Sequence, residues 1–468
     1  MMHWHSIGCV LLLICMEPVF GQASRTALSK ETFAITNVNL ISMTNDQIQP
    51  KTTILIREGR IAELGTNITI PDGTRIIIDG SGKFLIPGLA DMHVHLYSDD
   101  VAPKSKAPDE LGVIVANGVT TVRMMIGTPD HLQLRRSIQE GKVLGPQMWI
   151  ASPQFTGRKD TNAKVVTTPL EAQNAVKECA DAGYDFIKLT LFITPEVFEG
   201  ISSEGARQGI RLVGHVDPRV GVVKSLAAGQ HIEHLDNYLE SILKDDAPMK
   251  ESVSDRGVFR PKNWESIDYI DDKKIKILAK ATADSRTWTC PTLTIFKKAF
   301  AQGQSLEEIR SRPDWLLQPQ KHRDMYLAAH ERYWKNPPSE ARRKRWVEVR
   351  NQLVKEIAAA GGKIVAGSDT PEWFFGYGFT LHRELESLVN AGLTPYQALS
   401  AATCNAAEFL HAKTEWGTIE KGKRADLVLL SANPLDNIRN TTQIEGVSIG
   451  GNWLDKDKLK DMIQTASR

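Results

Sequence analysis

The chain has 468 residues, of which 41% are hydrophobic and 24% charged, and its formal net charge is +1. These values exclude an intrinsically disordered protein, a collagen and a polytopic membrane protein. The chain has no overall basic excess, so we expect no nucleic-acid partner. Two of the five cysteines, Cys9 and Cys15, lie close to the N-terminus, so too few remain elsewhere for a scaffold built on disulfides.

The N-terminal segment resembles a secretory signal peptide. Residues 7–16 (IGCVLLLICM) form an apolar run that is too short to cross a bilayer and has the length of a signal-peptide core. Gly21, Ala23 and Ser24 follow as small residues, and cleavage after Ala23 is expected, with Gly21 as the alternative. We therefore interpret residues 1–23 as a signal peptide and expect a secreted or periplasmic protein without a transmembrane segment.

Both ends of the remaining chain are rich in β-branched residues. The segments predicted as strands are residues 32–43, 52–64, 74–79, 424–430 and 446–453. Glu58-Gly59 and Gly450-Gly451 mark tight turns within two of them. Neither end has enough strands to be stable alone. We therefore predict one discontinuous β-sandwich domain, built from residues 24–86 and 414–468.

Between these ends, strand and helix patterns alternate, which is typical of an α/β fold with a parallel sheet. The predicted strands are residues 89–96, 119–126, 147–152, 186–192, 211–216, 231–235, 287–295 and 363–368. The helices predicted over residues 168–183 and 194–209 both begin with Thr-Pro and end in glycine. Eight such units predict a (β/α)8 TIM barrel over residues 87–413, with a doubly wound open sheet as the alternative.

Two long insertions follow the sixth and seventh predicted strands, at residues 236–270 and 297–345. Both follow the carboxyl ends of strands, where barrel enzymes place their active sites. We interpret them as lids or substrate walls.

Histidine and aspartate residues gather at the predicted strand ends. Asp91, His93 and His95 alternate along the first strand and therefore share one face. Two imidazoles at this spacing can chelate one metal ion such as zinc. His215, His234 and Asp369 end the fifth, sixth and eighth strands. The combination predicts a metal site at the mouth of the barrel.

His231 and Lys188 also lie near these strand ends, and their roles need separate arguments. His231 lies on the opposite strand face from His234, so we assign it a structural role. Lys188 ends the fourth strand, but a free ammonium has no lone pair for a metal. The residue pattern leaves three roles open for Lys188: carboxylation by carbon dioxide, binding of an anionic substrate group, or pairing with Asp217 or Glu233.

These residues lie in motifs that resemble the amidohydrolase superfamily, in particular its imidazolonepropionase-like and prolidase-like metal-dependent hydrolases. The motifs are Phe84-Leu-Ile-Pro-Gly-Leu-Ala-Asp-Met-His-Val-His95, Gly118-Val-Thr-Thr-Val-Arg123, Phe186-Ile-Lys188, Gly214-His-Val216, Ala228-Gly-Gln-His-Ile-Glu-His234, Ala366-Gly-Ser-Asp369 and Gly417-Thr-Ile-Glu-Lys-Gly-Lys-Arg-Ala-Asp-Leu-Val-Leu-Leu430. The resemblance covers almost the whole chain after the signal peptide.

The resemblance implies a ligand set and a mechanism. His93, His95 and Asp369 would hold one divalent metal, expected to be zinc. Carboxylated Lys188 would bridge it to a second metal held by His215 and His234. The two cations would share a water and lower its pKa. Asp369 would be the catalytic residue that takes the proton of this water and passes it to the leaving amine.

The substrate class stays open at this point. We expect hydrolysis of an amide bond in a dipeptide, an N-acyl amino acid or a similar small amide. The alternatives are a hydrolase of lactone, ester or carbamate bonds with the same site, and a mononuclear deaminase or imidazolone-type hydrolase. Asp217 stands where some prolidase-like relatives have a histidine or tyrosine facing the substrate, which argues against strict prolidase specificity unless Asp217 is turned away. The sequence also leaves a homo-oligomer open.

Overall fold

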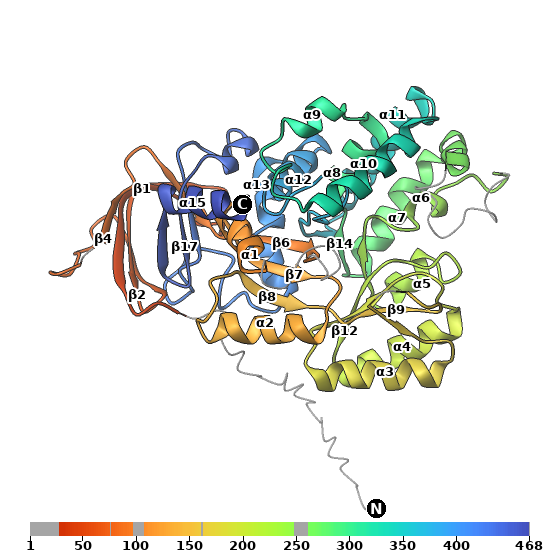
Figure 1. Ribbon diagram of the computed structural model, residues 1–468, viewed down its shortest axis with the longest axis horizontal. Helices are drawn as coiled ribbons and strands as arrows, with labels where there is room; N and C mark the ends of the chain where they lie inside the picture. Colours follow the sequence, from red (N-terminus) through yellow and green to blue (C-terminus); the bar gives the residue numbers. More distant parts are fainter. Residues whose placement is uncertain (1–27, 75, 97–106, 161, 248–260, 468) are drawn as a thin grey trace, which may run out of the picture.

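The computed structural model describes residues 28–74, 76–96, 107–160, 162–247 and 261–467. The expected signal peptide lies outside these residues, as does a large part of the first insertion. Figure 1 shows an α/β region with a β-rich region beside it, to which both ends of the described chain contribute. Among the described residues, no helix combines the length and the apolar character needed to span a membrane.

The β-rich region is an eight-stranded sheet that mixes strands from both ends of the chain. Its strands are β1 (Thr32–Ile41), β2 (Ile48–Arg57), β3 (Arg60–Gly65), β4 (Ile76–Asp79), β5 (Phe84–Pro87), β16 (Leu427–Leu430), β17 (Ile444–Ile449) and β18 (Asn452–Asp455). The order is β18-β17-β16-β5-β1-β2-β3, with β4 paired to β1. The junction between the two ends is the antiparallel pair β5–β16, in which Ile86 lies opposite Val428. The association of the two chain ends agrees with the sequence prediction, while the domain boundaries stay a prediction.

Two hairpin turns of this sheet use residues with positive φ. Glu58 and Gly59 have φ of 51° and 71°, and Gly450 and Gly451 have φ of 56° and 81°. Two consecutive positive φ values are typical of a type I′ turn, whose twist matches that of the flanking strands. The two turns also touch, because a Cβ added at Gly451 would lie 2.4 Å from the Cα of Gly59.

The α/β region contains all eight strands predicted from the sequence. They are β6 (Leu89–Val94), β7 (Val119–Met124), β8 (Gln147–Ile150), β11 (Phe186–Leu189), β12 (Arg211–Gly214), β13 (His231–Glu233), β14 (Trp288–Cys290) and β15 (Lys363–Ile364). Two short strands that the sequence did not predict, β9 (Gln154–Thr156) and β10 (Ala163–Val165), lie in the connection after β8. All of these strands pair in parallel, which confirms the α/β class.

The strands divide between two parallel sheets rather than one continuous ladder. One sheet has the order β6-β7-β8 and the other β10-β9-β11-β12-β13-β14-β15. Isolated parallel bridges join Ala151 to Phe186 and Val94 to Thr370, at the two places where these sheets meet. The closed barrel therefore stays a prediction, although the bridges bring the edges of the sheets together.

All eight strands end before their predicted bounds, and for the seventh strand the reason is local. Residues 287–295 were predicted as a strand, but β14 ends at Cys290 and a helical turn, α8 (Leu293–Ile295), follows Thr292. Pro291 has no N–H for a sheet, and Thr292 adopts a left-handed φ of 44°. The buried carboxylate of Glu384 then accepts the N–H groups of Leu293 and Thr294, both at 2.8 Å, which favours the helical turn.

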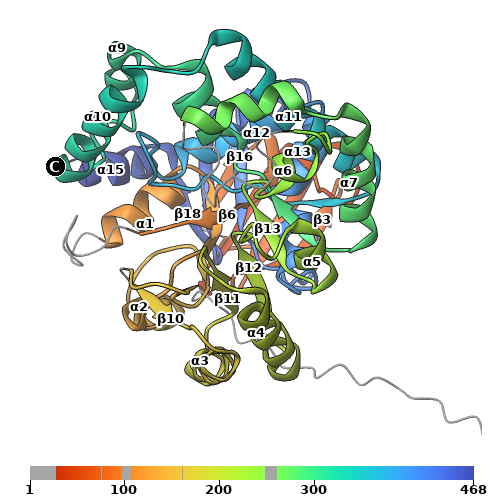
Figure 2. The ribbon, with the colours of Figure 1, turned by 90° about the vertical axis from the view of Figure 1, so that its right-hand side faces the viewer.

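Helices cover the outside of the parallel strands. They are α1 (Ala107–Ala116), α2 (Pro129–Gln139), α3 (Pro169–Ala182), α4 (Pro195–Gln208), α5 (Val222–Ala227), α7 (Asp272–Asp284), α12 (Phe379–Asn390), α13 (Pro395–Ala401) and α14 (Cys404–Phe409), whereas the short α6 (Tyr238–Ser241) lines the cavity described below. As predicted, α3 and α4 begin at Thr168 and Thr194 caps and end at Gly183 and Gly209 in the left-handed conformation. These two helices lie side by side outside β11 and β12 (Figure 2).

The second insertion is helical. It contains the π-helix η4 (Phe296–Gln302), α9 (Leu306–Arg310), α10 (Gln320–Trp334) and the start of α11 (Glu340–Ala359). In both ribbon views α9, α10 and α11 gather on one side of the α/β region (Figures 1 and 2). The other elements are the 3-10 helices η3 (Pro261–Tyr269) and η5 (Ile438–Thr442) and the C-terminal α15 (Lys456–Ala466).

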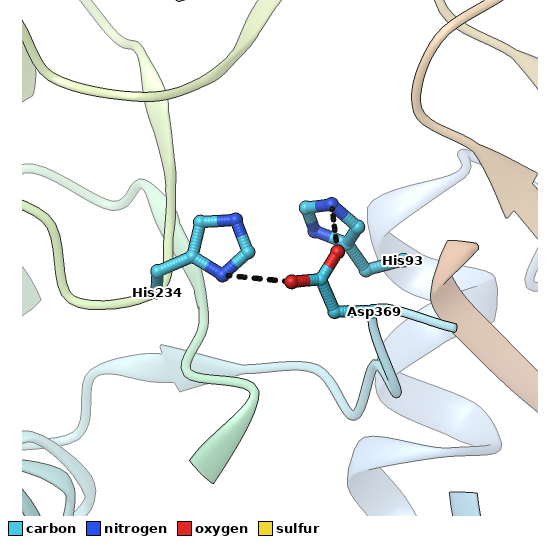
Figure 3. A group of neighbouring side chains, drawn as sticks. All are labelled: His93, His234 and Asp369. Atoms are coloured by element: carbon cyan, nitrogen blue, oxygen red, sulfur yellow. Dashed lines mark ion pairs between the residues drawn. The ribbon is translucent and has the colours of Figure 1, made fainter. Parts of the chain in front are cut away.

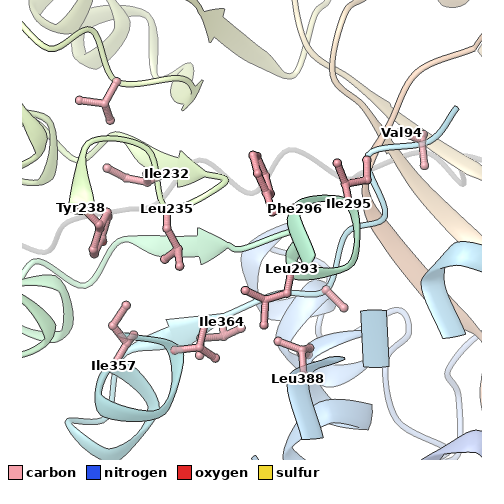
Figure 4. Close-up of a cluster of buried hydrophobic side chains, with 14 of the residues drawn as sticks. Val94, Ile232, Leu235, Tyr238, Leu293, Ile295, Phe296, Ile357, Ile364 and Leu388 are labelled. Atoms are coloured by element: carbon pink, nitrogen blue, oxygen red, sulfur yellow. The ribbon is translucent and has the colours of Figure 1, made fainter. Parts of the chain in front are cut away.

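An apolar core fills the space between the strands and their helices. Ile232 of β13, Ile357 of α11 and Leu388 of α12 are fully buried in one cluster (Figure 4). Phe296 belongs to the same cluster and also reaches the cavity described below. The core thus fixes the strand ends that carry the polar residues.

Candidate metal centre and active site

All six predicted ligand residues line one cavity of about 480 Å³. They are His93, His95, Lys188, His215, His234 and Asp369. Five of them lie in or directly after the parallel strands β6, β11, β12 and β13, and Asp369 lies five residues after the end of β15. Because parallel strands place their carboxyl ends at one edge, residues far apart in the sequence meet there.

Asp369 lies at the centre of this group. Its Oδ1 is 3.2 Å from Nε2 of His93 and 3.3 Å from Nε2 of His95, and its Oδ2 is 3.8 Å from Nδ1 of His234. In Figure 3 the side chains of His93 and His234 point toward the two oxygens of Asp369. The nearest ligand atoms of His93, His234 and Asp369 lie within 4.8 Å of one another, as one metal ion requires.

Several buried polar atoms of the group have no hydrogen-bond partner within the described part of the chain. They are Nδ1 of His95 and Nζ of Lys188, together with Nε2 of His93, whose contact with Asp369 lacks hydrogen-bond geometry. Buried polar groups without partners are costly and call for an explanation such as an ion. The donor set of imidazole nitrogens and a carboxylate suits zinc, so these residues fit a divalent metal.

The electrostatics of the site favour neutral imidazoles. Burial, with the charge of Lys188 as a second cause, lowers the pKa of His95 to about 4. Burial likewise holds the pKa of His93 and of His234 well below the ordinary value. Burial also lowers the pKa of Lys188 and raises the pKa of Asp369 to about 7. Neutral imidazole is the form that binds a metal.

A buried pair that the sequence did not assign orients His93. Nδ1 of His93 lies 2.8 Å from Oε2 of Glu233, and Nη2 of Arg123 donates to both oxygens of Glu233 at 2.7 and 2.8 Å. Nε of Arg123 donates to the carbonyl of Met92 at 2.5 Å. A carboxylate behind a ligating histidine fixes the ring and its tautomer. Strand alternation places Glu233 on the same face as His231 and opposite His234, so the sequence pattern gives no sign that Glu233 reaches the metal group.

The other histidines have their own partners. Nδ1 of His215 lies 2.5 Å from Oδ2 of Asp236, and Nδ1 of His234 lies 2.7 Å from Oγ1 of Thr292. His234 and Asp369 also adopt positive φ, 61° and 57°. Such a backbone is uncommon outside glycine and concentrates at functional sites.

Three residues discussed from the sequence lie away from the metal group. Asp91 is buried and accepts the N–H of Ser368 at 2.8 Å, so it ties β6 to the segment before Asp369. Nδ1 of His231 accepts the N–H of Trp288, which agrees with its structural role. Asp217 is turned away from the cavity.

The partners of Asp217 explain its orientation. Its carboxylate accepts two hydrogen bonds from the side chain of Arg219, at 2.9 and 2.8 Å, and one from the N–H of Ile193 at 2.9 Å. Its neighbours Val216 and Pro218 line the cavity instead. Asp217 therefore does not repel an anionic substrate group.

The model of the amidohydrolase family matches residues 84–454. The chain belongs to this family. The match spans the ligand residues and also β16, β17 and most of β18, so the family pattern includes the C-terminal strands of the mixed sheet.

Individual relatives are more distant. Imidazolonepropionase from Cupriavidus pinatubonensis is 24% identical over 244 residues, which cover 39% of this chain and little more than half, 57%, of that relative. The solved structure of a putative prolidase from Bifidobacterium longum covers 94% of this chain and is itself covered completely, with a TM-score of 0.66 and 23% identity. Bottromycin amidohydrolase has a TM-score of 0.72 at 21% identity, with 97% of this chain and 95% of that chain covered. At these identities the two structures establish similarity of fold alone.

Proposed function

We propose that this protein is a metal-dependent hydrolase that cleaves an amide bond in a dipeptide, an N-acyl amino acid or a similar small amide. The observation that carries the proposal is the convergence of His93, His95, Lys188, His215, His234 and Asp369 on one cavity. Family membership supports hydrolysis of carbon–nitrogen bonds. We further propose that the parallel strands form one (β/α)8 barrel over residues 87–413, and that residues 24–86 and 414–468 form a β-sandwich domain.

The proposed site holds two divalent metal ions, zinc in our interpretation. His93, His95 and Asp369 would hold one ion, and His215 and His234 would hold the other. Lys188 would supply ligand oxygens to both once its neutral amine had attacked carbon dioxide, which forms a new N–C bond and releases a proton. Burial lowers the pKa of Lys188 and thereby favours the neutral amine that this step needs. Ions bound here supply Lewis acidity that polarises the substrate carbonyl and lowers the pKa of water.

The side chains perform the remaining steps. Asp369 accepts the proton of the attacking water at a carboxylate oxygen and delivers it to the nitrogen of the leaving amine, so the carboxylate is regenerated in each cycle. Glu233 and Arg123 hold the ring of His93, and Asp236 and Thr292 hold those of His215 and His234. The fixed rings keep the ligand atoms in position through the reaction.

The test combines metal analysis with a substrate panel. Purified protein is assayed for metal content and for turnover of dipeptides, N-acyl amino acids and lactones. Two ions per chain and turnover of at least one amide support the proposal, whereas turnover of lactones alone would contradict the amidase assignment. One ion per chain together with an active Lys188→Ala variant would contradict the bridging lysine.

We also propose that residues 1–23 direct export and are removed. N-terminal sequencing of the protein isolated from its native source tests this proposal. A mature protein that begins directly after the predicted cleavage site supports export, and one that begins at Met1 contradicts it.

A further inference from the structure

Two aromatic side chains line the cavity although the proposed chemistry does not use them. Phe296 begins the π-helix η4, and Trp373 lies four residues after Asp369 in the loop that leads to α12. Their rings are linked through buried Phe300, which lies 6.2 Å from Phe296 and 4.5 Å from Trp373 between ring centroids. We call Phe296, Phe300 and Trp373 the aromatic wall.

The aromatic wall stands next to the metal ligands. The ring of Phe296 lies 5.6 Å from the ring of His234 in an edge-on arrangement. Figure 4 shows Phe296 beside Ile295 and Leu293 at the start of the second insertion. A substrate bound at the ligand residues therefore contacts this wall with a group close to its scissile bond. π-Helical turns such as η4 are rare and occur frequently at functional sites.

The position of Trp373 is enforced by the inserted helices. Its φ of 54° is unfavourable for a bulky residue, so the surrounding structure has to maintain it. The ring of Tyr326 from α10 lies 5.5 Å from that of Trp373, and the hydroxyl of Tyr326 donates to Glu372. Helix α10 thus fixes the residue before Trp373 as well as its ring.

An ion pair between the buried carboxylate of Asp314 and the partly exposed Arg383 holds the same loop further along. Asp314, between α9 and α10, accepts the N–H of Gly376 at 2.8 Å. Arg383 of α12 donates to both oxygens of Asp314, at 2.8 and 2.9 Å, and the guanidinium of Arg312 donates to the carbonyl of Phe374. Since both flanks of Trp373 are anchored, the wall is preorganised and presents a fixed apolar surface.

We propose that the aromatic wall selects substrates in which a group next to the scissile amide carries an aromatic or similarly flat apolar side chain. This inference rests on the proposed amidase function and specifies its substrate class. Aromatic rings attract one another edge-on or offset, beyond the effect of the area they bury. Leu191, Leu235 and Leu239 also line the cavity and extend its apolar surface.

The test uses two pairs of dipeptides that differ in one ring. Gly-Phe against Gly-Ala probes the amine side of the bond, and Phe-Gly against Ala-Gly probes the acyl side. We expect the wild-type protein to prefer the aromatic member of one pair at least about tenfold in kcat/KM, as burial of a phenyl group in an apolar site predicts. Trp373→Ala should reduce this preference at least about fivefold, and Trp373→Phe, which keeps a ring, should retain most of it.

Two further variants keep the test decisive. Phe296→Leu keeps an apolar residue in the core and should also reduce the preference. It replaces Trp373→Ala as the test if that variant proves unstable. Trp315→Phe changes an aromatic residue that packs on Phe374 but does not line the cavity, and it should leave the preference unchanged.

The outcomes separate the inference from the function on which it rests. Turnover of dipeptides without an aromatic preference, or a preference that survives both Trp373→Ala and Phe296→Leu, would overturn the aromatic wall and leave the amidase function intact. Turnover of none of the amides in the wider panel would overturn both.

Discussion

Glu233→Gln is the substitution that most directly tests how the site is built. Glu233 is buried with Arg123, and both side chains are only 1% exposed. The amide keeps the shape of the carboxylate but removes the charge that faces Arg123 and Nδ1 of His93. Two separate losses should follow, one in folding stability and one in metal affinity.

The magnitudes come from the two contacts. A buried guanidinium left without its carboxylate costs about 3–5 kcal/mol of unfolding free energy. Loss of the carboxylate behind a ligating histidine lowers metal affinity about 10- to 100-fold, or ~1.4–2.8 kcal/mol. Urea unfolding of the metal-free protein measures the first loss, and competition with a chromophoric chelator measures the second.

A double variant and a distant control separate the two losses. Arg123→Met combined with Glu233→Gln removes the unpaired charge and should recover much of the stability, but not the metal affinity. Asp426→Asn breaks the buried Arg424–Asp426 pair, whose side chains are 1% and 3% exposed and do not line the cavity. It should lower stability alone. Wild-type metal affinity in Glu233→Gln would refute the orienting role of Glu233.

Three further predictions follow from other parts of the structure. Asp369→Asn should lower kcat about 10²- to 10⁴-fold because the proton carrier is lost, while metal analysis still finds bound metal; near-normal turnover would refute the role of Asp369. Asp314→Asn should cost about 1–3 kcal/mol in urea unfolding because it disrupts the hydrogen bonds that the buried carboxylate accepts from Arg383 and Gly376. Arg383 and Arg312 hold the pKa of Asp314 below its usual value against the effect of burial. The stabilisation that ionised Asp314 contributes is therefore present at neutral pH and is lost as the pH falls through the pKa of the folded state. The unfolding free energy of Asp314→Asn should accordingly fall less steeply than that of the wild type as the pH is lowered. The same fall of unfolding free energy with decreasing pH in wild type and variant would contradict this role of Asp314. Metal removal by a chelator should abolish turnover and lower the thermal midpoint, and zinc should restore both; full activity of the metal-free protein would contradict a metal-dependent mechanism.

The apolar pattern of the strands and the residues that begin and end helices explain how much could be predicted from the sequence. Thr-Pro before α3 and α4 and glycine after them located both helices, and the apolar runs located eight of the ten parallel strands but not the short β9 and β10. Since strand ends converge in a parallel sheet, the polar residues at these ends were enough to predict that the four histidines and Asp369 meet, whereas the ligand role of Lys188 came from the family resemblance.

Interactions between distant residues could not be predicted in this way. Strand alternation gives the face on which Glu233 lies, but not its pairing with Arg123, which is 110 residues away in the sequence. The early end of β14 depends on Glu384, which lies about 90 residues after the N–H groups it binds. The orientation of Asp217 likewise depends on the backbone of Ile193, which lies 24 residues earlier. Each of these features needs the tertiary structure.

The pairing of β5 with β16 sets an order of events during synthesis on the ribosome. Residues 84–87 hydrogen-bond to residues 427–430, so this edge of β5 stays without its partner until nearly all of the described chain has been made. Contacts of such large sequence separation form slowly and leave intermediates that can aggregate. Leu85 and Ile86 are fully buried in the finished sheet but have no cover from β16 while the intervening region is translated. Chains that terminate before β16 would keep this apolar edge exposed, which makes them natural targets for chaperones and proteases.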